Sequence, residues 1–139
     1  MTTHLTLDVP AEHRYLKAIG ACLAALLGDC ATERTLYNIQ LAVHEACVNI
    51  IEHAYGDVKG RIMLSFYLEQ EPHQVLIELT DTGQSFDLNA IPAPDLDALP
   101  ERGYGLYLMR QLLDEVSYRP GSDKGNQWRL VKYLTASDT

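Results

Sequence analysis

The sequence has few of the features that mark secreted, membrane-spanning or nucleic-acid-binding proteins. Its three cysteines form no CxxC pair, which disfavours a disulfide framework or a zinc ribbon and favours reduced core thiols in a cytosol. The 11 basic residues are outnumbered by 19 acidic ones and form no run, so we expect no nucleic-acid partner, although a basic pocket for a phosphate remains open.

Long apolar runs are also absent. The amino terminus lacks the basic start and apolar stretch of a signal peptide, and the longest apolar run, around residues 19–27, is too short to cross a bilayer. We therefore expect a soluble, cytoplasmic protein with no membrane partner. The chain has 139 residues, of which 47% are hydrophobic and 22% charged, and this balance predicts one globular domain over residues 1–139.

The most informative stretch is 41–56, LAVHEACVNIIEHAYG. Apolar residues recur there every three or four positions, which predicts a helix with one buried face, starting at Thr32 or Thr35 and running to about Ala54. Glu45 and Asn49 fall on another face, one turn apart, where both can reach the same point in space. On this segment alone, solvated surface residues are the commoner interpretation. With a divalent ion and a reacting hydroxyl, the same pair could form a site.

The remaining periodicities predict a sheet with helices beside it. Alternation predicts strands, and spacings of three and four predict helices. The expected elements are an edge strand at 5–9, a helix at 11–27, a hairpin of 62–68 with 75–79, a helical stripe from 106 to 116, a strand at 115–119, a turn at 120–126 and a strand at 127–134. This order predicts an α+β fold, a two-layer sandwich in which helices cover one face of a mixed, mostly antiparallel sheet.

A long polar segment interrupts this order. Residues 84–104 hold three prolines and several acidic residues, and a loop of this length is often a lid or a binding loop, the alternative being a surface insertion. The sequence Arg102-Gly103-Tyr104-Gly105-Leu106 closes it, directly before a helical stripe. Two glycines at a helix start let backbone amides approach an anion, which favours the lid, although GxG is a weak signal by itself.

Three stretches together resemble a known superfamily. EACVNIIEHAYG resembles the N box, DTGQSF the first glycine box and RGYGLYLM the second glycine box of the GHKL (Bergerat) ATPases and kinases. The short chain and the N box ending in EHAYG are most similar to anti-sigma-factor serine/threonine kinases of the RsbW type. The three boxes occur in order and the resemblance covers nearly the whole chain.

The resemblance implies ATP and Mg²⁺ as cofactors and gives the residues roles. By it, Glu45 is the general base, Asn49 the Mg²⁺ ligand and Asp81 the carboxylate that reads adenine. A carboxylate accepts a hydrogen bond from the exocyclic amine of adenine but would face the O6 acceptor of guanine. The residues implied at the cofactor are Asn49, His53, Asp81, Gly83, Phe86, Arg102, Gly103, Tyr104, Gly105, Leu106 and Asn126.

Three of these assignments have alternatives. Arg102 could place a cation at the γ-phosphate or be a solvent-exposed charge of the lid. His53 matches a common N-box histidine, but a group that packs or caps the helix end is favoured over a catalyst. Asn126 stands where the family often has a threonine in the adenine network, so its contact is open.

As a function, the resemblance implies a serine/threonine kinase that works by partner switching. Such a kinase sequesters a sigma factor until an unphosphorylated STAS-domain antagonist competes for it, and the resemblance also suggests a homodimer. One alternative is a non-catalytic module that uses ATP only to control association with a partner. Another is the detached catalytic domain of a histidine kinase.

Overall fold

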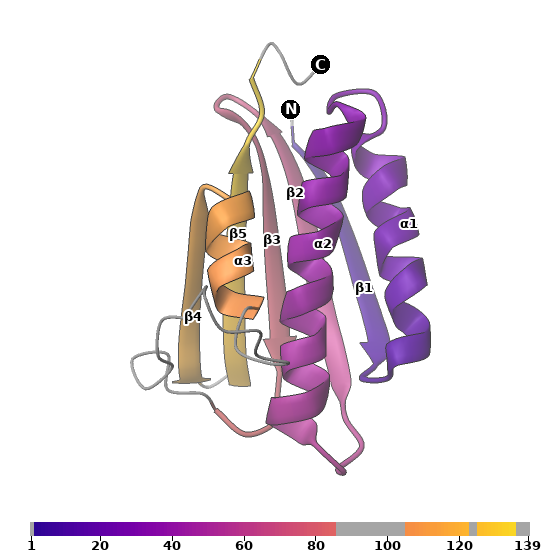
Figure 1. Cartoon of the computed structure of the whole chain (residues 1–139), viewed down its shortest axis with the longest axis vertical. Helices are drawn as coiled ribbons and strands as arrows, with labels where there is room; N and C mark the ends of the chain where they lie inside the picture. Colours follow the sequence, from indigo (N-terminus) through magenta and orange to yellow (C-terminus); the bar gives the residue numbers. More distant parts are fainter. Residues whose placement is uncertain (1, 86–104, 123–124, 136–139) are drawn as a thin grey trace, which may run out of the picture.

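The computed structural model describes residues 2–85, 105–122 and 125–135. In these ranges, three α-helices lie on one face of a five-stranded sheet, with α2 between α1 and α3 (Figure 1). The helices are α1 (Leu16–Leu27), α2 (Glu33–Asn49) and α3 (Gly105–Leu112), with a 3-10 turn η1 (His13–Tyr15) before α1 and a π-helical turn η2 (Ile50–Tyr55) after α2. The strands are β1 (Thr3–Pro10), β2 (Arg61–Gln70), β3 (His73–Asp81), β4 (Glu115–Ser122) and β5 (Gly125–Tyr133).

The strand order is β1-β2-β3-β5-β4, and each neighbouring pair is antiparallel. The expected α+β, two-layer architecture is therefore confirmed, and the described strands include no parallel pair. β1 is an edge strand, as predicted. β3 is central, and its last residue, Asp81, lies opposite Asn126 of β5. The register thus brings together two residues that are far apart in the sequence.

The core lies between the sheet and the helices. In β2, Ile62, Leu64 and Phe66 are fully buried, while the residues between them face away, which is the alternation expected of a half-buried strand. The hydroxyl of Thr32 accepts a hydrogen bond from the backbone N–H of Thr35 at 3.1 Å, so Thr32 is the N-cap of α2. From this start, α2 places its apolar stripe on the sheet.

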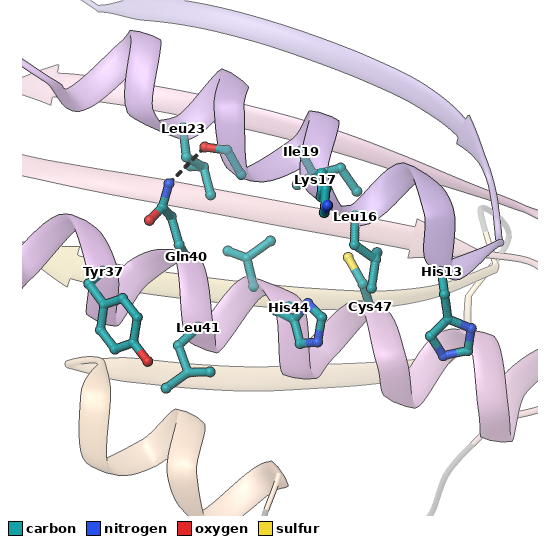
Figure 2. Close-up of a pocket in the computed structure, with 12 residues that line it drawn as sticks. His13, Leu16, Lys17, Ile19, Leu23, Tyr37, Gln40, Leu41, His44 and Cys47 are labelled. Carbon is teal, nitrogen blue, oxygen red and sulfur yellow. Dashed lines mark hydrogen bonds between the residues drawn. The ribbon is translucent and has the colours of Figure 1, made fainter.

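Helices α1 and α2 are joined by a side-chain contact and leave a groove between them. The Gln40 amide donates to the backbone carbonyl of Gly20 at 2.9 Å (Figure 2). The groove has a volume of about 450 Å³, and Leu16, Leu41 and the buried Cys47 are among the residues that line it. Cys47 lies in the core, as predicted, and burial raises the pKa of its thiol to about 12. Cys22 and Cys30 are only half-buried.

The structure corrects three predicted boundaries. The helical stripe was expected to reach Val116, but α3 ends at Leu112, because the N–H of Asp114 already bonds to the carbonyl of Val131 and draws the chain into the sheet. The predicted turn at 120–126 is shorter, since β4 continues to Ser122 after a register irregularity. The second helix is α-helical only to Asn49, and the last six residues before Gly56 form the wider π-turn.

No helix within the described ranges is long and apolar enough to cross a membrane.

Candidate functional site

Two side chains of α2 face the beginning of α3. Glu45 and Asn49 are half-buried and lie one turn apart. A Cβ built on Gly105 would lie 3.1 Å from Glu45 Oε2 and 3.4 Å from Asn49 Nδ2, so the backbone of Gly105 closely approaches both side chains. The structure thus brings together three of the predicted residues. The first turn of a helix has backbone N–H groups without intrahelical partners, and these favour an anion.

Asp81 ends β3 and is almost completely buried, with 1% of its surface exposed. Its Oδ1 accepts hydrogen bonds from the N–H of Gly83 at 2.9 Å and from Asn126 Nδ2 at 3.0 Å. Its Oδ2 is buried and has no hydrogen-bond partner among the described residues. Burial raises the pKa of the Asp81 carboxyl, and the hydrogen bonds from Asn126 and Gly83 oppose that rise. One acceptor atom is therefore left for a ligand.

Asn126 is 2% exposed and holds Asp81 in place. Its Nδ2 donates to Asp81 Oδ1 and to the carbonyl of Gly83 at 2.9 Å. Its Oδ1 accepts from Ser85 Oγ at 2.6 Å and from the N–H of Gly121 at 3.0 Å. A carboxamide has two donor hydrogens and two acceptor lone pairs, so all four are used inside the protein. The sequence left the contact of Asn126 open; the structure places its amide on Asp81, and this amide has no capacity left for a ligand.

Gly83 lies against the end of the N box. A Cβ at Gly83 would overlap the carbonyl of Ala54, and the N–H of Gln84 donates to that same carbonyl at 2.7 Å. A glycine is required here by close packing of two backbones. The contact ties the first glycine box to the π-turn η2.

Sequence reasoning missed Tyr55, which makes a second tie between the same segments. The N–H of Thr82 donates to the Tyr55 hydroxyl at 2.9 Å, and this hydroxyl donates to the carbonyl of Arg61 at 2.7 Å. The residue had been interpreted only as the end of a helix. A tyrosine followed by glycine is typical of many helix ends, so the local sequence carried no signal for this role. The sequence analysis also gave no role to Ser85 and Gly121, which both donate to Asn126 Oδ1.

The structure describes only some of the other predicted residues. Phe86, Arg102, Gly103 and Tyr104 lie outside the described residues, as does the expected lid over 84–104 apart from its first two positions. His53 is exposed on η2. Leu106 is 9% exposed and belongs to the hydrophobic core, where it packs as a helix side chain.

The residues in this region fit an adenine nucleotide better than a metal bound by protein alone. In the part of the chain that the structure describes, no group of three or more His, Cys, Asp or Glu residues could hold a metal ion. Mg²⁺ keeps several waters and is often completed by phosphate oxygens, so Asn49 could serve as its one protein ligand. The unpartnered Oδ2 of Asp81 matches an exocyclic amine, and the glycine at 105 leaves room beside Glu45.

Comparison with known families identifies the domain. The profile of the histidine kinase-like ATPase domain matches residues 9–132. The chain is 31% identical to the serine-protein kinase RsbW of Bacillus velezensis over 141 residues, which cover 94% of this chain and 86% of that protein. It is 30% identical to the serine-protein kinase RsbW of Halalkalibacterium halodurans over 139 residues, with 94% and 83% covered.

Two solved structures share the fold. The RsbU and RsbW domains of a Mycobacterium tuberculosis protein match with a TM-score of 0.67 at 20% identity, over 95% of this chain and 32% of that longer chain. The histidine kinase domain of a blue-light activated kinase from Erythrobacter litoralis matches with a TM-score of 0.59 at 20% identity, over 90% of this chain and 61% of that one.

Proposed function

The chain belongs to the histidine kinase-like ATPase domain family, and on this premise we propose that it is a Mg-ATP-dependent serine/threonine protein kinase that acts as an anti-sigma factor. Its substrate would be a STAS-domain antagonist, and it would hold a sigma factor until that antagonist competes. The relatives named serine-protein kinase RsbW, which match over most of their length, support this proposal.

The observation that carries the proposal is the free acceptor of Asp81. Its Oδ2 is buried without a partner in the described part of the chain, while Oδ1 is held by two donors. The exocyclic amine of adenine can donate to Oδ2, whereas guanine presents an acceptor at that place. An unpaired buried acceptor costs about 1–3 kcal/mol, which is enough to select ATP over GTP.

The part of the candidate site where phosphoryl transfer would take place contains Glu45, Asn49 and Gly105. Bound Mg-ATP supplies the phosphoryl group that is transferred. Asn49 would ligate the Mg²⁺, and the amino end of α3 would stabilise negative charge. Glu45, one turn before Asn49, would orient or deprotonate the incoming serine or threonine hydroxyl.

Two other functions fit the same fold. A non-catalytic ATP-binding module would control a partner by association alone. A detached histidine-kinase catalytic domain would act on a histidine of another chain. Glu45 argues against the first, because its side chain makes no hydrogen bond to another residue within the described ranges and nucleotide binding alone needs no general base.

The test is transfer of labelled γ-phosphate from Mg-ATP to STAS-domain proteins of the same organism. We expect one of them to be labelled on serine or threonine, and Glu45→Gln to lose at least about 100-fold in transfer rate while it keeps its ATP affinity. Glu52→Gln, an exposed carboxylate on η2, is the matched control. ATP binding without labelling of any such protein would favour the binding module, and labelling of a histidine would favour the histidine kinase.

A further inference from the structure

We propose that Tyr55 is a positioning residue for base recognition, so that the end of the N box sets where Asp81 presents its free acceptor. The inference rests on the proposed ATP site and adds a residue and a route of control to it. Tyr55 would not touch the nucleotide. It would act through Thr82, the residue directly after Asp81.

The Tyr55 hydroxyl stands between two strand ends. Its single hydrogen goes to the carbonyl of Arg61 at the start of β2, at 2.7 Å, and its oxygen accepts from the N–H of Thr82 after β3, at 2.9 Å. Thr82 Oγ1 lies 3.4 Å from the same oxygen. Because the phenol hydrogen is already used, this second contact has Thr82 as its donor. The hydroxyl is therefore engaged on both sides.

The ring is fixed as well as the hydroxyl. Tyr55 is 8% exposed, and its ring occupies the space that a Cβ on Gly60 would take. The backbone just after it turns sharply, since Gly56 has a positive φ of 58° and its N–H bonds to the carbonyl of Ile51 at 3.0 Å, five residues back. Such π-type turns occur often at functional sites. Here the turn places the Tyr55 side chain beside the end of β3.

The turn at 81–84 is consequently held from two sides. From the helix side, Tyr55 binds the N–H of Thr82, and the carbonyl of Ala54 accepts from Gln84. From the sheet side, Asn126 binds Asp81 and Gly83. Because η2 continues α2, the first set of contacts links the base-reading carboxylate to the helix that carries Glu45 and Asn49. Loss of the phenol hydroxyl should loosen one side only.

The decisive variant is Tyr55→Phe, which removes one oxygen and keeps the ring beside Gly60. The Thr82 N–H then lacks its partner, and we expect about tenfold weaker ATP binding, a similar fall in the ATP-to-GTP affinity ratio and an unchanged kcat at saturating ATP. Tyr37→Phe is the matched control, because that tyrosine is 62% exposed on α2. It should change none of the three quantities.

A purely structural role for Tyr55 predicts a different result. Tyr55→Phe would then lower the melting temperature but leave the ATP-to-GTP ratio unchanged, and that outcome would overturn the proposal while wild-type phosphoryl transfer still supported the proposed function. Wild-type protein that binds no ATP would overturn both. A second measurement on the wild type covers a variant that does not fold: exchange of the Thr82 amide hydrogen should already be slow without ATP, because the Tyr55 hydroxyl binds it, and fast exchange would contradict the inference.

Discussion

Asp81 and Glu45 are carboxylates of the same candidate site, but their surroundings are opposite. Asp81 is 1% exposed and one of its oxygens is fixed by two donors, which are themselves anchored to neighbouring residues. Glu45 is half-buried on the side of α2 and makes no hydrogen bond to another residue in ranges 2–85, 105–122 and 125–135. A Cβ built on Gly105 would lie 3.1 Å from its Oε2.

Under the proposed function, this difference would separate recognition of the base at Asp81 from phosphoryl transfer at Glu45. At the Asp81 end, Asn126 donates to Asp81 and the Tyr55 hydroxyl accepts from the N–H of Thr82 before any ligand arrives, so little ordering remains to be done on binding. At the Glu45 end, the side chain would gain its partners only when the phosphates of ATP and an acceptor hydroxyl bind. We expect variants at the first end to change affinity, and variants at the second to change rate.

The largest effect on affinity should come from Asp81→Asn. The amide can keep the bonds that Oδ1 makes, but it turns an N–H toward the exocyclic amine of adenine, so ATP binding should weaken about 10- to 100-fold. Removal of a buried charge should leave the unliganded protein at least as stable. Titration calorimetry and thermal unfolding check the two parts, with the exposed Asp57→Asn as control. Unaltered ATP affinity would remove Asp81 from base recognition.

A smaller effect, and one on rate, is expected from Gly105→Ala. The new Cβ would lie 3.1 Å from Glu45 Oε2, so that side chain must shift by a few tenths of an ångström, while the 3.4 Å to Asn49 Nδ2 is an ordinary contact. We expect phosphoryl transfer to slow about tenfold, with a smaller change in ATP affinity. Gly20→Ala is the control, because its Cβ would meet Gln40 only at 3.8 Å, an ordinary contact. An affinity loss as large as the rate loss would contradict the proposed division between ATP binding at Asp81 and phosphoryl transfer at Glu45.

Much of this arrangement could be predicted from the sequence, because local periodicity determined it. The alternating hairpin and the half-exposed pair Glu45 and Asn49 follow from spacings within one segment. The N-cap was narrowed to Thr32 or Thr35, and the structure selects Thr32. The order of elements was sufficient for the two-layer architecture. Where two periodicities overlap, as at Val116, the sequence predicted both a helix and a strand, and the backbone pairing of Asp114 with Val131 decided for the sheet.

The contacts that hold Asp81 could not be predicted in this way. Asn126 meets it only because β3 pairs with β5 in one particular register, 45 residues apart, and no local pattern specifies that register. Tyr55 reaches Thr82 only because a π-turn replaces the last α-helical turn. Its helical periodicity is too similar to that of an α-helix for six residues to distinguish them.

The next effect concerns stability. Asn126→Ala removes partners from Asp81 Oδ1, the Gly83 carbonyl, Ser85 Oγ and the Gly121 N–H, and we expect a loss of about 1–3 kcal/mol in the free energy of unfolding, together with weaker ATP binding. Denaturant titration measures the loss, with Asn38→Ala on the half-exposed side of α2 as control. Equal stability of the two variants would mean that the network does not preorganise the Asp81 end.

The smallest expected effect is a dependence on pH that belongs to Asp81 alone. Burial raises the pKa of this carboxyl in the folded state, so the folded protein holds the proton more tightly than the unfolded chain. Stability relative to Asp81→Asn should therefore be greatest below the unfolded pKa of about 3.9 and decrease as the pH rises through the raised folded-state pKa. ATP affinity should change in the opposite direction, because protonation removes the acceptor that Oδ2 offers to adenine. Melting and ATP titrations of both proteins between about pH 4 and 8 test this. Parallel pH profiles for the wild type and the variant would show that burial does not raise the pKa of Asp81.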